Sequence, residues 1–281
     1  MDELNPPAWR DRPVDPDTAP TVRSRGFGVV EAVLPPSSVA AAIDALGAVF
    51  AAEDDIALAR RWRTNAYRVA YMLPAKHRHF LALCRPSPLA ELAAALLGRD
   101  CVLAGFNGLD MIPGGEAQPL HRDHAVPTPG VPLYLHAVVA LDAFTVASGA
   151  TRIVPGSHRE ATDEPVTQNG PPPEVDTEPN AAVHDDRESE AVHVGLQPGD
   201  ALVYDATCVH AGSANTTDHP RRALHVLFAR RWVQPLWDFP GSLSADDVAG
   251  LDPERRRLLG FGNTPARYDH DARRSFGYGW G

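Results

Sequence analysis

The sequence predicts a mainly β protein with flanking helices, built as an antiparallel sandwich or barrel. Two observations lead to this fold class. From residue 101 onward, short segments rich in Val, Leu, Tyr and Phe follow one another between Gly and Pro residues. Before residue 101, apolar residues recur at helical spacing instead. With 281 residues, the chain is long enough for two modest domains or for one sandwich or barrel with additions.

The N-terminal part predicts an arm, one strand and three helices. Residues 1–20 contain five prolines and are expected to be extended. The segment VVEAVLPP over 29–36 predicts a short strand that ends at its two prolines. Helical spacing then covers 37–51 behind a serine N-cap. A pair of helices is expected over 76–98, and Gly98 closes the second of them.

Six strand-like segments make up the β-rich half. Each is short and bounded by turn residues, which is typical of antiparallel sheets. They are CVLAGFNGLDMI (101–112), PLYLHAVVALDAF (132–144), ATRIVPG (150–156), AVHVGL (191–196), DALVYDATCVHAG (200–212) and RALHVLFARRW (222–232).

The charge of the chain is concentrated in one segment. The sequence has 26 Lys and Arg against 36 Asp and Glu, a net charge of −10, which argues against binding to nucleic acid or to an anionic membrane. Ten of the acids and a single base lie between Glu160 and Glu190, so this segment alone carries −9. It is rich in proline and poor in large apolar residues, which predicts a mobile insertion over 159–191. Such an insertion is either a solvated loop or a lid over a pocket.

The remaining composition predicts a cytoplasmic protein organised as one domain. No run of 18 apolar residues is present, and the first residues, MDELNPPAWRDRP, do not resemble a secretory signal. The three cysteines show no paired spacing, which favours reduced thiols over a disulfide framework. We expect a flexible arm (1–23) and a single domain (24–281), which contains N-terminal helices (37–98), a β core (101–232), the acidic insertion (159–191) and a C-terminal extension (236–281).

A metal-binding motif lies in the β-rich half, in the segment QPLHRDH over 118–124. On an extended strand, residues two apart project to the same side, so His121 and Asp123 are able to share one metal ion. Two histidines and one carboxylate form the ligand set typical of non-haem Fe(II) oxygenases. The HRD triplet also occurs in kinase catalytic loops, but the other kinase motifs are absent from this sequence.

The surroundings of the motif make it more specific. His210 follows in Val209-His210-Ala211-Gly212, and Arg221 stands eleven residues after His210. The planar guanidinium of arginine suits a bidentate grip on a carboxylate, such as the distal carboxylate of 2-oxoglutarate. Neighbouring strand residues face opposite sides, so Arg222 is expected to point away from Arg221.

Five motifs together resemble the phytanoyl-CoA dioxygenase family of Fe(II)/2-oxoglutarate oxygenases, over residues 24–260. They are G-F-x-V-V-x-x-V-L, Q-x-x-H-x-D, S-G-A-T-R-I-V-P-G-S-H, P-G-D-A-L-V-Y-D-x-x-x-V-H and the H-x10-R spacing. The resemblance implies a double-stranded β-helix, a jelly-roll, cupin-like barrel with helices packed on one sheet. Two departures are Ala211, where many relatives have glycine, and the acidic insertion.

The resemblance also implies roles for individual residues. His121, Asp123 and His210 would bind Fe(II), and Arg221 would pair with the distal carboxylate of 2-oxoglutarate. Gln118 and Thr151 match positions that hydrogen-bond the same co-substrate. Apart from the resemblance, His158 is expected to belong to a turn set by Pro155-Gly156. The C-terminal aromatic tail over 276–280 is expected either to fold across the pocket or to be disordered. The other singled-out residues are expected to pack or to line the pocket; these are His124, His136, Cys208, His225, Asn65, Tyr67, Phe106 and Asn107.

The resulting functional hypothesis is an Fe(II)/2-oxoglutarate-dependent dioxygenase that uses dioxygen to oxidise, most simply to hydroxylate, an unactivated C–H bond. Its partner would be a small-molecule substrate, for which an intermediate of specialised metabolism is one candidate. Its co-products would be succinate and CO2. Because the carboxylate ligand Asp123 is present, halogenation is disfavoured. Two alternatives stay open at this point. One is a non-catalytic jelly-roll that binds a ligand as a sensor, and the other is a cupin-like hydrolase or isomerase with zinc or manganese.

Overall fold

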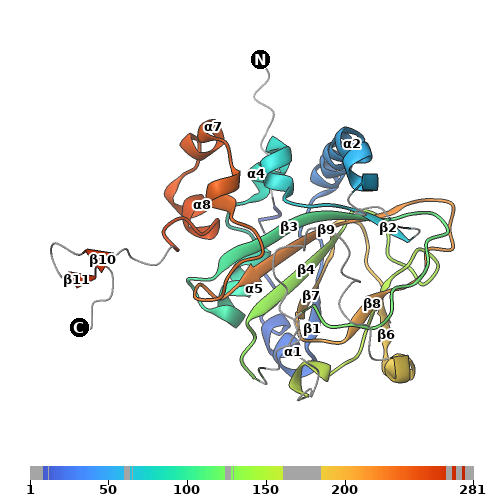
Figure 1. The fold of residues 1–281 in the computed structure, drawn as a ribbon. Coiled ribbons are helices and arrows are strands. Elements are labelled where there is room, and N and C mark those ends of the chain that lie inside the picture. Colours follow the sequence, from blue (N-terminus) through green and yellow to red (C-terminus); the bar gives the residue numbers. More distant parts are fainter. Residues whose placement is uncertain are drawn as a thin grey trace.

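The computed structural model describes residues 9–11, 13–59, 64, 66–123, 128, 130–160 and 185–263, together with the short strands β10 (Tyr268–Asp269) and β11 (Arg274–Ser275). Two antiparallel sheets form its centre (Figure 1). The larger sheet has six strands in the order β1-β7-β4-β9-β3-β2, and the smaller has three in the order β6-β5-β8.

The strands of the larger sheet come from distant parts of the chain. They are β1 (Phe27–Val30), β2 (Tyr67–Ala70), β3 (Val102–Met111), β4 (Tyr134–Ala140), β7 (Ala201–Asp205) and β9 (Arg221–Ala229). The smaller sheet contains β5 (Thr151–Ile153), β6 (Val192–Val194) and β8 (His210–Gly212). A bridge between His121 and His210 adds one more residue pair beside β8.

Helices cover the outer side of the larger sheet (Figure 1). Before β3 the chain forms α1 (Thr18–Arg25), α2 (Pro36–Ala59), α3 (Leu73–Lys76), α4 (Arg78–Leu83) and α5 (Pro88–Leu97), and after β9 it forms α6 (Phe239–Ser242), α7 (Ala245–Ala249) and α8 (Pro253–Leu258). Helix α5 begins where the Ser87 side chain accepts from the backbone N–H of Ala90, and it ends at Gly98, whose φ of 113° favours glycine.

Each face of the larger sheet packs into its own apolar cluster. Leu103, Phe106 and Val226 belong to the cluster that includes the helices. Val138, Leu202 and Ala223 belong to a second cluster, which also contains residues of the smaller sheet. Residues two apart on a strand share a face, so these clusters tell which side chains point between the sheets. We call that side the inner face.

The predicted fold class is confirmed: the protein is mainly antiparallel β with flanking helices, and its two sheets are compatible with a jelly-roll. All six predicted β segments contain a strand, and the segment over 200–212 contains two, β7 and β8. The short 3-10 helix η1 (Ser157–Arg159) leads into the acidic insertion, and η2 (Asp185–Glu190) lies within its C-terminal end. Residues 161–184 of that insertion lie outside the described residues. Whether the insertion is a lid therefore stays a prediction.

The predicted extended arm over 1–20 is wrong at its C-terminal end. Helix α1 already begins at Thr18, and Trp9 is buried, with its indole N–H donating to the carbonyl of Leu83. Within the described part of this segment, Trp9 therefore packs into the core that contains the helices. Among the described residues, no helix has the length and apolar content needed to cross a membrane.

Candidate metal centre and active site

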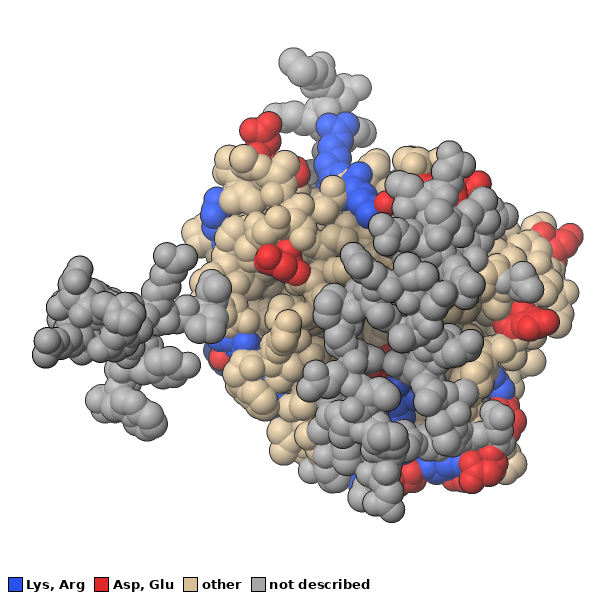
Figure 2. All heavy atoms as spheres, viewed as in Figure 1, with Lys and Arg blue, Asp and Glu red and all other residues tan. Residues whose placement is uncertain are grey.

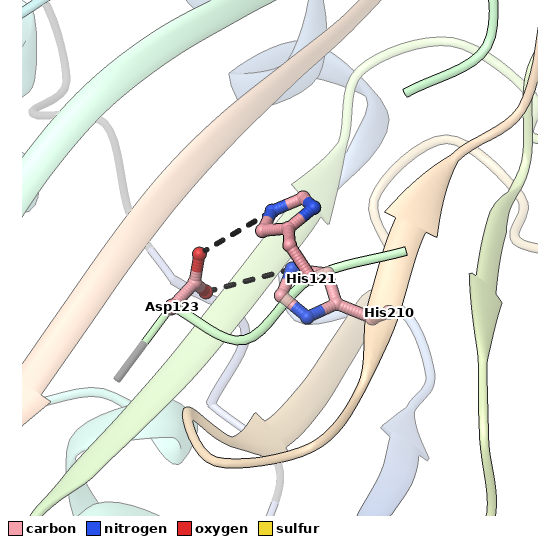
Figure 3. Close-up of side chains that lie close together, drawn as sticks. All are labelled: His121, Asp123 and His210. Atoms are coloured by element: carbon pink, nitrogen blue, oxygen red, sulfur yellow. Dashed lines mark ion pairs between the residues drawn. The ribbon is translucent and has the colours of Figure 1, made fainter. Parts of the chain in front are cut away.

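His121, Asp123 and His210 lie together on the inner side of the smaller sheet (Figure 3). One ligand atom from each residue lies within 4.8 Å of the others. Nε2 of His121 is 3.8 Å from Oδ1 of Asp123, and Nε2 of His210 is 3.6 Å from Oδ2. The two imidazole rings are 4.6 Å apart between centroids. Two nitrogen donors and one carboxylate thus face a common point.

Backbone pairing brings these residues together. The N–H of each of His121 and His210 donates to the carbonyl of the other, at 2.9 Å in both directions. The predicted extended strand through His121 and Asp123 is only partly present, because His121 forms a single bridge and Asp123 lies in a bend. The bend nevertheless leaves both side chains on one side, as the spacing predicts.

Hydrogen bonds at Nδ1 orient both histidines. Nδ1 of His121 lies 2.9 Å from the carbonyl of Pro119, and Nδ1 of His210 lies 3.0 Å from the carbonyl of Cys208. A carbonyl only accepts, so each Nδ1 carries the proton in the neutral ring. The lone pair of each ring is then on Nε2, the nitrogen that faces Asp123. Metal-binding histidines characteristically have this arrangement.

Asp123 is held by two side chains from the larger sheet. Its Oδ2 accepts from the hydroxyl of Tyr204 at 2.9 Å and from Nδ1 of His136 at 2.8 Å. Burial favours the neutral carboxyl, but the charges of His210, His136 and His121 and the hydrogen bond from His136 outweigh it, and the pKa of Asp123 lies well below its ordinary value. Burial also lowers the pKa of His210 to about 4. An ionised carboxylate beside the neutral imidazole of His210 is a form that binds a cation.

Arg221 is a buried cation on the same inner face. It begins β9, is 4% exposed, and its guanidinium carbon lies 4.1 Å from the centroid of Phe144. Among the described residues no carboxylate pairs with it, and its buried Nε has no hydrogen-bond partner. Burial lowers the pKa of Arg221 to about 10, so it remains charged at neutral pH. An unsatisfied buried donor is costly, and a bound anion would satisfy it.

The neighbouring arginine has the opposite environment, as predicted. Arg222 makes a bidentate pair with Asp142, with Nε and one terminal nitrogen each 2.8 Å from a carboxylate oxygen. The alternation along β9 therefore leaves only Arg221 of the two on the inner face.

Gln118 and Thr151 both lie beside Gly212 of β8. Oε1 of Gln118 accepts from the N–H of Gly212 at 2.9 Å, and its side chain is also hydrogen-bonded to Tyr67. Thr151 is the register partner of Gly212 and is 7% exposed. Their predicted contacts with 2-oxoglutarate stay predictions.

Several other expectations can be compared with the structure. Cys208 is fully buried, and its thiol lies 3.3 Å from the carbonyl of Gly26, as expected for a packed thiol. Phe106 packs in the outer core, whereas Oδ1 of Asn107 accepts from the N–H of Met72 and from the indole N–H of Trp237. His124, Asn65 and the aromatic tail lie outside the described residues.

The sequence did not single out Tyr204. It lies in the P-G-D-A-L-V-Y-D segment, which carried part of the family resemblance. Within that segment it follows apolar residues, as any buried strand residue would, so the pattern gives no sign of a role at the site. Its contact with Asp123 joins residues 81 positions apart.

The sequence pattern of the phytanoyl-CoA dioxygenase (PhyH) family matches residues 22–223. The chain belongs to this family. Three fungal relatives agree with this assignment. The dioxygenase FrzG of Cladobotryum is 30% identical over 187 residues, which cover 61% of this chain and 57% of the relative. The multifunctional dioxygenase ausE of Emericella nidulans is 30% identical, covering 58% of this chain and 53% of the relative. The iron/alpha-ketoglutarate-dependent dioxygenase okaE of Penicillium ochrochloron is 26% identical, covering 59% and 51%.

Solved structures show the same fold. The alpha-ketoglutarate-dependent carbocyclase SnoK from nogalamycin biosynthesis superposes with a TM-score of 0.64 at 20% identity, covering 88% of this chain and 94% of that one. The epimerase SnoN, solved with Fe3+, alpha-ketoglutarate and nogalamycin RO, gives a TM-score of 0.58 at 25% identity, covering 84% and 91%. The predicted family is thereby confirmed, and the comparisons agree with the predicted class of enzyme and its cofactors. The chain spans about half the length of the curated relatives it matches.

Proposed function

We propose that this protein is an Fe(II)/2-oxoglutarate-dependent dioxygenase that oxidises an unactivated C–H bond of a small organic molecule. One observation carries the proposal: a His-Asp-His ligand set and a buried arginine without a carboxylate partner among the described residues share the space between the two sheets. The first suits a divalent metal ion, and the second suits the distal carboxylate of 2-oxoglutarate.

The residues present fit the iron. His121 and His210 would bind through Nε2, because their Nδ1 protons are already donated to backbone carbonyls. Asp123 would supply the carboxylate. With three protein ligands, the metal would keep room for 2-oxoglutarate and dioxygen. When bound, iron supplies the oxidising chemistry, with succinate and CO2 as co-products.

The co-substrate is proposed to be held by residues of both sheets. Arg221 is proposed to bind the distal carboxylate from β9, where its 4% exposure limits competition from water for its donors. Gln118 and Thr151 are proposed to hydrogen-bond the co-substrate from the side of β8 and β5. The chain itself would thus position the co-substrate and the substrate and exclude water, which determines where the reacting carbon lies relative to the metal.

We propose hydroxylation as the simplest outcome. The similarity to the epimerase SnoN, which comes from nogalamycin biosynthesis, keeps epimerisation as an alternative outcome and supports a substrate from specialised metabolism. We propose that the protein binds a small molecule, and that it binds neither nucleic acid nor a membrane. In the view of Figure 2 the visible described residues are mostly uncharged, and the basic side chains are scattered. Three free cysteines are consistent with a reducing, cytoplasmic setting.

The test is the release of succinate from 2-oxoglutarate by the purified protein, with Fe(II) and oxygen, over a panel of small molecules. Succinate that depends on all three components supports the proposal, and zinc should inhibit it. Binding of metal and 2-oxoglutarate without succinate would favour a sensor. Activity sustained by zinc would favour a hydrolase or isomerase.

A further inference from the structure

A row of polar side chains crosses the inner face of the larger sheet and ends on Asp123. Tyr204, His136 and His225 come from β7, β4 and β9, which are neighbours in the sheet. His136 is the register partner of Tyr204, and His225 is the partner of Val138, two residues further along β4. The three side chains therefore share one face. The apolar side chains of Val138, Ala140, Leu202 and Ala223 lie on the same face.

The row is connected by hydrogen bonds. Nδ1 of His136 lies 2.8 Å from Oδ2 of Asp123, and Nε2 of His136 lies 3.1 Å from Nδ1 of His225. A carboxylate only accepts, so Nδ1 of His136 carries a proton. With both rings neutral, Nε2 of His136 then accepts, and Nδ1 of His225 donates to it. The tautomer of His136 is thus matched by the tautomer of His225.

The hydroxyl proton of Tyr204 is not committed to the carboxylate of Asp123. Its hydroxyl has one proton but three close neighbours, which are Oδ2 of Asp123 at 2.9 Å, Nδ1 of His136 at 2.9 Å and Nε2 of His210 at 3.0 Å. Nδ1 of His136 also lies near the Tyr204 oxygen, but its charged neighbour, Oδ2 of Asp123, is the nearer acceptor at 2.8 Å. With a metal ion on Nε2 of His210, the Tyr204 hydroxyl would also donate to Oδ2, and two donors on Oδ2 would leave Oδ1 for the metal.

We propose that His136 is a positioning residue of the metal centre: it holds Oδ2 of Asp123 so that the carboxylate binds the metal through Oδ1 alone, and His225 keeps His136 in the required tautomer. The inference rests on the proposed metal site and adds these two residues to it. A carboxylate with one bound oxygen leaves a coordination position that a chelating carboxylate would occupy. The row would thereby keep coordination positions open for 2-oxoglutarate and dioxygen.

Substitutions of His136 test this directly. His136→Phe keeps a ring of similar size but has no donor. His136→Asn places its amide N–H2 near the former position of Nδ1 and so keeps a donor for Oδ2. His219→Phe is the matched control, because the side chain of His219 is 83% exposed. The readout is Co(II) binding to the metal-free protein in oxygen-free buffer, followed by its visible d–d absorption spectrum, with circular dichroism to verify folding.

We expect His136→Phe to weaken Co(II) binding about 10- to 100-fold, as removal of a hydrogen bond to a metal ligand typically does, and to change the shape of the spectrum. His136→Asn should recover most of the affinity and the wild-type spectrum, and His219→Phe should match the wild type. The inference is overturned if His136→Phe binds Co(II) with wild-type affinity and spectrum, or if His136→Asn loses as much as His136→Phe.

His225→Leu provides a second route if His136→Phe does not fold. It leaves the contact with Asp123 in place and removes only the partner of Nε2, so a smaller loss of affinity with the same spectral change is expected, and unchanged binding overturns the role of the row. Failure of the proposed function would give a different result, because the wild-type protein itself would then bind no Co(II) or release no succinate.

Discussion

Replacing Arg221 by methionine should change co-substrate binding and stability in opposite directions. The side chain is 4% exposed, and within the described part of the chain its Nε has no hydrogen-bond partner. Removing one partner of a buried, hydrogen-bonded charge pair costs about 2–5 kcal/mol. Because about 1.4 kcal/mol corresponds to a factor of ten, the Kd for 2-oxoglutarate should rise from about 30-fold to several thousand-fold.

The protein without 2-oxoglutarate should become more stable. Methionine removes a buried donor that no described residue satisfies, and such a donor costs about 1–3 kcal/mol. It also removes the contact between the guanidinium and Phe144, and such contacts contribute about 0.5–2 kcal/mol. The net expectation is a gain of about 1 kcal/mol in the free energy of unfolding, or about 2 °C in Tm for a domain of this size.

Calorimetry under anaerobic conditions with Fe(II) measures the Kd, and thermal unfolding measures the stability. Arg222→Met is the control: it breaks the pair with Asp142, which should lower stability by up to about 1 kcal/mol, and it should leave the Kd unchanged. The reasoning is refuted if Arg221→Met binds 2-oxoglutarate as tightly as the wild type, or if both variants lose binding equally.

Three further outcomes are expected. His121→Ala and Asp123→Ala should fold, as judged by circular dichroism, but should bind no Co(II) and release no succinate; succinate at the wild-type rate from either would contradict the ligand assignment. Burial raises the pKa of all three cysteine thiols, that of Cys101 to about 11, so iodoacetamide should label none of them in the native protein and all of them after denaturation. Fast native labelling would contradict the buried positions. Gly26→Ala should lower the free energy of unfolding by about 2–4 kcal/mol, because a Cβ there meets Cys208 and His158 and the φ of 88° is left-handed; an unchanged Tm would show that the turn relaxes.

The parts of the fold that are encoded locally were predictable. Each β segment is marked by its own apolar residues and its own turn residues, and the helix ending at Gly98 has its capping residues within the same segment. The separation of Arg221 from Arg222 follows from strand alternation alone. The spacing of His121 and Asp123 likewise predicts a shared side, even though a bend replaces the expected strand.

The parts that depend on contacts between distant residues were not predictable. Trp9 is buried because its indole reaches the carbonyl of Leu83, 74 residues away, and the proline-rich composition of its segment indicates the opposite. Tyr204 and His136 reach Asp123 across 81 and 13 positions, respectively. Sheet order determines these contacts, and no local pattern in the sequence encodes that order.

The most direct test of the central claim is the stoichiometry of succinate release against oxygen consumption by the wild-type protein with Fe(II) and 2-oxoglutarate. The account predicts one succinate for each oxygen molecule consumed, with the reaction stopped by a metal chelator and strongly reduced in Arg221→Met. Tight binding of Fe(II) and 2-oxoglutarate with neither oxygen consumption nor succinate, across the whole substrate panel, would contradict it.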